Sequence, residues 1–300
     1  TMVSQFIGFD RYGDEGKVMG LAPLGEDTYA DFFEGVLSPA KKGFELNPEY
    51  FLPFGANQGM EISDGGEMIV HRLYSDKFVR ELGPPREPYA EITQRDMDVA
   101  FGLQRIFEKY YMHVLTDLHS LVPSNRMAMA GGCALNSVAN GKALLETPFT
   151  EHCIQPAAGD DGLALGAALY ASNVLLNEGK RWVMRDSYLG DEYSDAEVRA
   201  ELDRYGVKYR ELGREELIDA TTDEVKNGNV IGWFQGRMEW GPRALGNRSI
   251  LAHPGFPNMK DILNARIKHR EAFRPFAPSV LREDAAAWFE FDGDSRYMLL

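Results

Sequence analysis

An arginine-rich stretch punctuated by glycines, residues 232–249, holds the side chains best suited to chemistry. Arg237, Arg243 and Arg248 lie in it, separated by a Gly-Pro pair and a further glycine. A guanidinium is a planar fork of donors that can hold two oxygens of a phosphate or carboxylate at once. Glycines let the backbone approach a ligand closely. The residue types and their spacing therefore predict an anion-binding loop.

A second group of basic residues follows within one helix length. Lys268, Arg270 and Arg274 stand in a segment that also contains two prolines, residues 268–278. Any one of them could be a surface salt-bridge partner. Basic residues gathered around two loops rich in Gly, Pro and Ser are harder to explain in that way. The two groups together predict an acidic small-molecule ligand.

The composition argues against nucleic-acid binding and bears on the location of the protein. The chain has 300 residues, 44% of them hydrophobic, and its 32 Lys and Arg against 46 Asp and Glu give a formal net charge of -14. It is long enough for two domains, and its acidity argues against sequence-independent binding to nucleic acid. The sequence predicts no membrane helix and no signal region. Cys133 and Cys153 fit a reducing compartment, so a cytoplasmic location is expected.

Two arrangements of strand, glycine loop and helix occupy the middle of the chain. In the first, the apolar run 127–130 leads through Gly131 and Gly132 into a predicted helix at 138–145. Backbone N–H groups and the helix dipole at such a junction favour an anion. A double glycine after a strand is, however, as often a simple tight turn.

The second arrangement is a predicted strand at 153–155, a loop at 156–162 and a helix at 163–169. Asp160 and Asp161 in this loop could cap the helix, which is a common role for an aspartate at that position. Beside the preceding glycine loop, an aspartate could instead hold the metal ion of a nucleotide. The residues alone leave both roles open.

The segment around Lys17 is only superficially like a phosphate-binding P-loop. Gly16 and Lys17 are followed by Val18 instead of the Ser or Thr that would hold magnesium, and the glycine spacing is wrong. A Walker A motif is therefore excluded. Lys17 could still reach a ligand, or it could be a solvated turn residue.

Several helices and strands are predicted to position these residues. Periodic apolar residues predict a long amphipathic helix from Thr93 to about Leu118. A capping box at 194–197 opens a further helix, and residues 215–226 form another that ends before Gly228.

An apolar strand at 230–234 precedes the arginine-rich stretch, and a helix at 257–268 precedes the second basic group. Residues 28–89 show little periodicity and give no functional signal. The chain begins within an apparent strand and ends on an apolar run, so it is expected to be a fragment of a longer protein.

Five blocks of the sequence, taken together, resemble the signature segments of the O-carbamoyltransferases that modify nodulation factors and antibiotics. They occur in the same order along the chain, and as a set they are far more specific than any single loop. The blocks are residues 15–23, 131–136, 156–162, 236–249 and 270–278.

This resemblance implies an α/β fold in two domains, both incomplete. An ASKHA domain, the nucleotide-binding fold of actin and sugar kinases, is expected at 1–178, followed by a YrdC-like α/β domain at 179–300. The implied activity is ATP-dependent O-carbamoyl transfer. The second domain would make carbamoyl-adenylate from carbamoyl phosphate and ATP, and the first would transfer the carbamoyl group to a hydroxyl of a small acceptor such as a sugar, nodulation factor or antibiotic.

The resemblance also implies roles for individual residues. Asp160 matches a ligand of a divalent metal, expected to be iron. The residues implied in catalysis at the carbamoyl phosphate and ATP pocket are Lys268, Arg270, Arg274, Arg243 and Arg248. The residues implied in nucleotide binding are Lys17, Gly131, Gly132, Asn136, Gly159, Asn247 and Ser249.

The sequence departs from the family pattern in one respect. The family carries two closely spaced metal-binding histidines upstream of the first block, and no His-x-x-x-His pair occurs in this sequence. Asp160 would then lack its partners, and the isolated chain could be inactive.

The sequence also allows other interpretations of its function. A relative acting in hydrogenase maturation is disfavoured by the lack of zinc-type cysteine pairs, and one acting on tRNA by the acidic composition. A non-catalytic nucleotide-binding module is a third possibility. An ASKHA sugar kinase would fit the glycine loops but would leave both basic groups without a role.

Overall fold

The contacts of the chain divide it into two compact units. The computed structural model describes residues 1–52, 60–179, 181–290 and 294–300. Unit 1 comprises Thr1–Ala128 and Asn136–Cys153, and unit 2 comprises Met129–Leu135 and Ile154–Leu300. This division by contacts does not test the family domains expected at 1–178 and 179–300, which stay a prediction.

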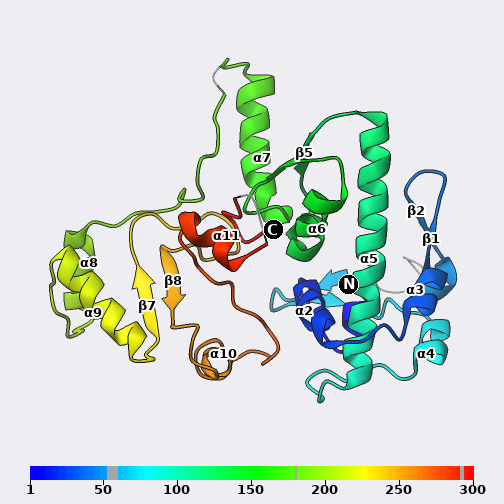
Figure 1. The fold of residues 1–300 in the computed structure, drawn as a ribbon, viewed down its shortest axis with the longest axis horizontal. Helices are drawn as coiled ribbons and strands as arrows, with labels where there is room; N and C mark the ends of the chain where they lie inside the picture. The colour runs from blue at the N-terminus through cyan, green and yellow to red at the C-terminus, as the bar shows by residue number, and fades with distance from the viewer. Residues whose placement is uncertain (53–59, 180, 291–293) are drawn as a thin grey trace. The chain divides into compact units, whose positions relative to one another are not determined.

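Unit 1 is built around the long helix α5 (Gln94–Leu121), which has 28 residues (Figure 1). At its start, Asp96 Oδ2 accepts hydrogen bonds from the backbone N–H and the hydroxyl of Thr93, at 2.9 and 2.8 Å. Val99 and Ile106 are buried on its apolar side. The helix predicted from Thr93 onward is therefore confirmed. The elements that pack on α5 are α1 (Met2–Phe6), α2 (Glu15–Leu21), the 3-10 turn η1 (Ala22–Leu24), α3 (Ala30–Val36) and α6 (Ser137–Glu146).

Aromatic rings fill the core of unit 1. Phe78 of α4 (Asp76–Leu82) meets Phe6 and Phe32 edge to face, with ring centroids 4.9 and 5.2 Å apart. Such T-shaped pairs add to the stabilisation that burial of the rings provides.

The strand expected at the start of the chain is wrong. Residues Met2–Phe6 form helix α1, and Met2, Val3, Ser4 and Phe6 in it are buried. A short apolar run suits a buried helical turn as well as a buried strand, because its periodicity cannot separate the two.

The region without periodicity forms short elements in unit 1. Three-residue strands are too short for an alternating pattern to be visible. Antiparallel pairs are made by β1 (Leu37–Pro39) with β2 (Phe44–Leu46) and by β3 (Met60–Ile62) with β4 (Met68–Val70), and η2 (Pro48–Tyr50) is a 3-10 turn.

The two glycine loops lie next to each other in unit 2. β5 (Arg126–Met129) and β6 (Glu151–Ile154) pair in a two-stranded sheet. The 3-10 turns η3 (Gly132–Leu135) and η4 (Asp160–Gly162) follow these strands. The N–H of Gly131 donates to the carbonyl of Ala158 at 2.7 Å, which joins the loops directly. A small core beneath them contains Ala134, Ile154, Ala158 and Leu299.

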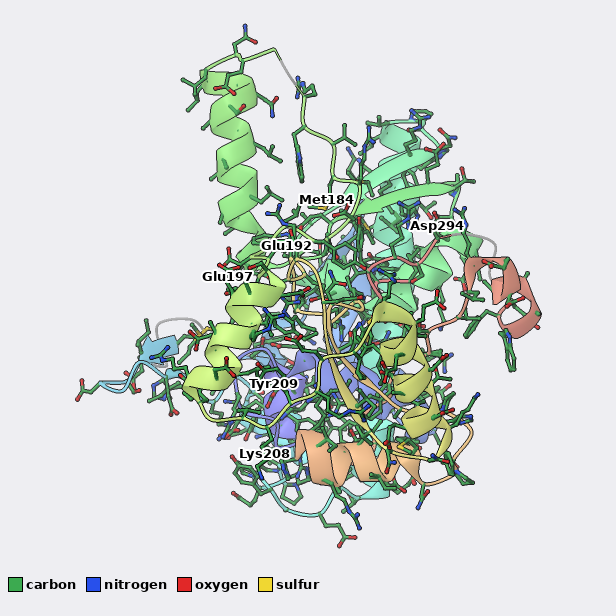
Figure 2. The ribbon with its side chains drawn as sticks, turned by 90° about the vertical axis from the view of Figure 1, so that its left-hand side faces the viewer. Met184, Glu192, Glu197, Lys208, Tyr209 and Asp294 are labelled. Carbon is green, nitrogen blue, oxygen red and sulfur yellow. The ribbon has the colours of Figure 1, made fainter. Side chains whose placement is uncertain are left out.

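The remaining helices of unit 2 agree with the sequence predictions at 163–169, 194–197, 215–226 and 257–268. The capping box of α8 is present, with Ser194 and Glu197 each accepting from the other's backbone N–H. Figure 2 shows Glu197 at the start of α8. The helical segments are α7 (Leu163–Tyr170), the π turn η5 (Ala171–Leu175), α8 (Asp195–Arg204), α9 (Arg214–Lys226), α10 (Met259–Ile262), the π turn η6 (Leu263–Lys268), η7 (Arg282–Asp284) and α11 (Ala285–Trp288).

The arginine-rich stretch is framed by an antiparallel pair in unit 2. β7 (Ile231–Phe234) runs beside β8 (Arg248–Leu251), and Phe234 faces Arg248 in the register. The pair closes the intervening residues into one loop. The elements are mixed α and β, as expected, and every sheet within the described residues has two strands. None of the described helices is long and apolar enough to cross a membrane.

Candidate functional site

The segment between β7 and β8, residues 235–247, is called the arginine loop here, and one buried carboxylate organises it. Glu239 is only 9% exposed. Its Oε1 accepts hydrogen bonds from the backbone N–H groups of Leu245, Asn247 and Arg248, at 2.8, 2.7 and 3.1 Å. A carboxylate that accepts several N–H groups holds them more strongly than a neutral acceptor. Glu239 therefore fixes the second half of the loop against its first half.

The same contacts set the charge state of Glu239. Burial raises the pKa of this carboxyl, but the hydrogen bonds from the backbone N–H groups outweigh burial, so its pKa lies below the ordinary glutamate value. Glu239 is therefore a carboxylate at neutral pH, and its charge lies within a loop that carries arginines.

The arginine loop is anchored to the loop that contains Asp160. The indole Nε1 of Trp240 donates to Gln155 Oε1 at 3.1 Å. Gly241 has φ of +104°, and a Cβ at this position would lie 2.9 Å from the carbonyl carbon and side chain of Pro156. A glycine is needed there both for the backbone conformation and for the close approach.

A second loop, residues 269–276, is held by a buried asparagine. Asn264 lies in η6 and is 1% exposed. Its Oδ1 accepts from Arg270 Nε at 2.7 Å, and its Nδ2 donates to the carbonyls of Ala272 and Arg274 at 3.2 and 3.0 Å. The guanidinium of Arg270 also donates to the Pro275 carbonyl at 3.2 Å and lies over the Phe276 ring.

Three arginines from the two loops influence one another electrostatically. We call Arg243, Arg270 and Arg274 the arginine cluster. Burial lowers the pKa of Arg243, and the charge of Arg274 lowers it further. Burial and then the charge of Arg274 lower the pKa of Arg270; Glu271 partly offsets this, and Arg243 adds a smaller lowering effect. Arginine stays protonated in proteins, so the cluster concentrates positive charge.

Arg243 also contains a donor without an acceptor. Its Nε is buried and makes no hydrogen bond with the described residues. Arg274 has an acidic neighbour, with its Nη1 at 3.7 Å from Glu271 Oε2. Mutually repelling cations with an unsatisfied buried donor are stabilised by an anion that accepts from them. Phosphate and carboxylate oxygens fit this requirement.

The other arginines of the stretch make local structural contacts. Arg248 donates to the carbonyls of Gln235, Asn247 and Gly236 at 2.7, 3.0 and 3.2 Å, and it lies over the Phe234 ring. Arg237 donates to the carbonyl of Gly190 at 3.0 Å. These guanidinium groups hold the backbone of the loop.

Other predicted site residues are placed as follows in unit 2. The Asn247 amide donates to the Arg237 carbonyl at 2.7 Å, and Ser249 Oγ accepts from the Gly246 N–H at 2.8 Å. Lys268 is exposed at the end of η6. Their implied roles in catalysis and nucleotide binding stay predictions.

The predicted nucleotide loops also have distinct surroundings. In unit 2, a Cβ at Gly131 or Gly132 would meet no described atom within 4 Å, so the backbone there is open to approach. Gly159 immediately precedes η4. In unit 1, Asn136 caps α6 through Ala139 and exchanges hydrogen bonds with Gln104. The nucleotide role stays a prediction for these residues.

Lys17 forms an ion pair with Asp14 at 3.0 Å in unit 1. This contact gives the lysine a structural partner and leaves its implied ligand role a prediction.

The described residues do not by themselves complete a metal site. No group of three or more His, Cys, Asp or Glu side chains among them could hold a metal ion. Asp160 lies in η4 at the base of α7 and is exposed. An aspartate alone does not supply the several ligands that a protein-bound divalent cation needs.

Sequence reasoning missed two residues of this site. Glu239 and Asn264 do not belong to a recognisable functional motif, and residues of these types are common in any sequence. A signal does exist for Glu239, since an acidic residue among arginines and glycines suggests an internal acceptor. Asn264 lies within an otherwise ordinary helical segment and offers no comparable signal.

Comparisons with known proteins place this chain in a family. Residues 1–169 match the family described as Carbamoyltransferase N-terminus, and residues 222–300 match Carbamoyltransferase C-terminus. The chain belongs to the carbamoyltransferase family. The two loops of the arginine cluster both fall within the C-terminal match, and both glycine loops fall within the N-terminal match.

Named relatives agree with this assignment. The chain is 38% identical to nodulation protein NolNO of Sinorhizobium fredii, over 97% of the chain and 40% of that protein. It is 29% identical to a 3'-hydroxymethylcephem-O-carbamoyltransferase of Amycolatopsis lactamdurans, over 97% of the chain and 49% of that enzyme. An uncharacterised protein of Synechocystis is 40% identical over 98% of the chain and 47% of its own length. The chain thus spans about half the length of the curated relatives it matches.

Proposed function

We propose that the protein containing this chain is an ATP-dependent O-carbamoyltransferase. It would use carbamoyl phosphate to form carbamoyl-adenylate and would transfer the carbamoyl group to a hydroxyl of a small metabolite, such as a sugar, a nodulation factor or an antibiotic-like acceptor. Family membership and the named cephem enzyme support carbamoyl transfer. The observation that carries the proposal is the arginine cluster, with the buried unpaired Nε of Arg243.

The proposed reaction has two steps, the formation of carbamoyl-adenylate and the transfer of its carbamoyl group to the acceptor. In the first, water cleaves the P–O bond of carbamoyl phosphate, which releases phosphate and carbamate. A carbamate oxygen then attacks the α-phosphorus of ATP, and pyrophosphate leaves. In the second step the acceptor hydroxyl attacks the carbamoyl carbon, its proton is lost, and AMP leaves. The mixed anhydride makes that carbon electrophilic enough for an alcohol to attack.

The arginine cluster suits the first step. Carbamoyl phosphate, ATP and pyrophosphate are all polyanions, and the reaction builds charge on the phosphate oxygens. Guanidinium groups fixed before the reaction stabilise such charge without reorganisation. Arg243 and Arg270 are partly buried, which strengthens their interaction with an anion relative to water. Because the described residues do not complete a metal site, no step is assigned to a metal.

The proposal is tested by carbamoyl-phosphate-dependent exchange of labelled pyrophosphate into ATP. The assay is run on the protein that contains this chain and on this chain alone, with Arg274→Ala and, as a matched control, Arg210→Ala, an exposed arginine of unit 2 that pairs with Glu216. We expect exchange in the containing protein, loss of exchange with Arg274→Ala, and retention with Arg210→Ala. ATP binding without any exchange would instead favour a nucleotide-binding module or a kinase.

A further inference from the structure

Asn264 stands out because it is a polar side chain enclosed in unit 2 and is not part of any predicted motif. It is 1% exposed and is among the largest fully buried side chains of the chain. Burying an amide costs free energy unless its donors and acceptor are satisfied. An apolar residue could fill the same position without needing hydrogen-bond partners. The presence of an amide therefore suggests that its hydrogen bonds serve the groups that it contacts.

Within the described residues, all of its side-chain hydrogen bonds lead to the loop at residues 269–276, which carries Arg270 and Arg274. The Oδ1 takes the Nε–H of Arg270, and Nδ2 donates to the carbonyls of Ala272 and Arg274. The main-chain carbonyl of Asn264 also accepts from the backbone N–H of Arg270, at 3.0 Å. One residue therefore fixes the side chain of Arg270 and the main chain that carries Arg274.

The backbone at this point adopts a conformation that such a support stabilises. His269 has φ of +46° and ψ of 52°, the left-handed conformation, and it turns the chain sharply after η6. This conformation costs a residue with a Cβ about 1–2 kcal/mol. The Asn264 hydrogen bonds to residues on the far side of the turn oppose that cost. They also hold Arg270 and Arg274 in place against mutual repulsion.

The hydrogen bonds leave part of the Arg270 guanidinium for a ligand. Nε is bound to Asn264 and Nη2 donates to the Pro275 carbonyl, whereas Nη1 makes no hydrogen bond with the described residues. The plane of the guanidinium is thus set by the protein, and one edge remains to meet an anion. A fork of donors recognises phosphate only when its plane is correctly oriented.

We infer that Asn264 is a positioning residue for anion binding, which acts by orienting Arg270 and the backbone of Arg274 toward a phosphate group. This inference rests on the proposed function, since the phosphate would belong to carbamoyl phosphate or ATP. It assigns no chemical step to Asn264.

The test measures binding of inorganic pyrophosphate to this chain by calorimetry. Asn264→Ala is expected to weaken binding about tenfold, equivalent to about 1.4 kcal/mol. In an Arg270→Ala background the same change is expected to have a much smaller effect, because Asn264 acts mainly through Arg270. Equal losses in both backgrounds would mean that Asn264 does not act through the orientation of Arg270, and would overturn the inference.

A second variant keeps the inference testable if Asn264→Ala does not fold. Arg270→Lys retains the positive charge but lacks the Nε–H and the planar fork. We expect it to bind pyrophosphate about tenfold more weakly than the unmodified chain. Binding equal to that of the unmodified chain would show that orientation is unimportant, and would overturn the inference.

Failure of the inference and failure of the proposed function give different results. If the unmodified chain binds pyrophosphate, Arg274→Ala loses binding and Asn264→Ala does not, only the role of Asn264 is wrong. If the unmodified chain does not bind pyrophosphate at all, the anion site is wrong, and the proposed function loses its main support.

Discussion

At the scale of single residues, the arginines of this protein divide into two kinds that the sequence does not separate. Arg237 and Arg248 donate to backbone carbonyls around the arginine loop. Arg243, Arg270 and Arg274 repel one another electrostatically, although Arg270 also donates to Asn264 and to the Pro275 carbonyl. The first kind supports the loop, and the second kind concentrates positive charge, which is the basis of the proposed anion site.

This division predicts that one alanine substitution mainly weakens pyrophosphate binding and another mainly lowers the free energy of unfolding. Arg243→Ala should reduce pyrophosphate affinity by at least about tenfold while changing the free energy of unfolding by no more than about 0.5 kcal/mol, because it removes repulsion and an unpaired buried donor. Arg248→Ala should lower the free energy of unfolding by about 1–3 kcal/mol, because it breaks three hydrogen bonds. Calorimetry and urea unfolding measure the two effects. Similar stability losses in both variants would contradict the division.

The charge of Glu239 predicts a pH dependence of stability. Its pKa is lower in the folded chain than the ordinary value, so its charge contributes stability above that ordinary value, about 4.3. The contribution is lost as the pH falls through the folded-state pKa. Glu239→Gln should therefore lower the free energy of unfolding by about 1–2 kcal/mol at pH 7, and the difference from the unmodified chain should shrink at acidic pH.

Urea unfolding between pH 7 and pH 3, at fixed ionic strength, measures this difference. Glu215→Gln on the exposed surface of α9 is a matched control and should show little difference at any pH. If the difference in the free energy of unfolding between Glu239→Gln and the unmodified chain stayed constant on acidification, the carboxylate charge would not be what holds the loop.

At the scale of elements, unit 2 joins loops that are far apart in the sequence. The glycine loop after β5 is bonded to the segment after β6 through Gly131 and Ala158. That segment is in turn bonded to the arginine loop through Gln155 and Trp240. Short strands and turns, rather than a large sheet, thus bring the candidate site together.

The contact of Gly241 with Pro156 predicts a difference between two glycine substitutions. Gly241 and Gly246 both have positive φ, +104° and +112°. An alanine Cβ at 241 would lie 2.9 Å from Pro156, whereas at 246 the nearest described atom is 3.9 Å away. Gly246→Ala should cost about 1–3 kcal/mol of strain alone. Gly241→Ala should cost more and should also weaken pyrophosphate binding, because the arginine loop must move. Equal losses of stability and affinity would argue against anchoring by Pro156.

At the scale of the whole molecule, the two units differ in how they can be observed. The chain has four tryptophans, at 182, 233, 240 and 288, and all of them lie in unit 2. Unit 1 contains the 28-residue helix α5, which contributes strongly to far-ultraviolet circular dichroism. Fluorescence therefore reports on unit 2, while circular dichroism reports on both units.

This difference gives a test of where the anion binds. Pyrophosphate at about 100 times its Kd should stabilise the unit that binds it by about 2.7 kcal/mol. We expect the urea midpoint of the tryptophan fluorescence transition to rise, while part of the helical signal continues to be lost at the original midpoint. If both signals shift together, the two units unfold as one cooperative body. If neither shifts although calorimetry detects binding, the anion does not bind the folded state selectively.

The sequence by itself determined the local elements and the family. The Thr93 and Ser194 helix starts follow from capping and periodicity, which are properties of neighbouring residues. The order of five motif blocks indicated carbamoyltransferase membership, which the comparisons confirm. Residue type and spacing were also enough to predict an anion site near the two arginine-bearing segments.

Only the tertiary structure decided which arginines have their donors bound by the protein, and what holds the loops that carry them. The guanidinium group is chemically the same at every position, so its role depends on what the fold places around it. Arg248 donates to backbone carbonyls, whereas the Nε of Arg243 is buried without an acceptor among the described residues. The supporting roles of Glu239 and Asn264 depend on contacts with backbone groups several residues away in loops. The helix at residues 2–6 was missed for a related reason, since burial by distant residues fixes its conformation.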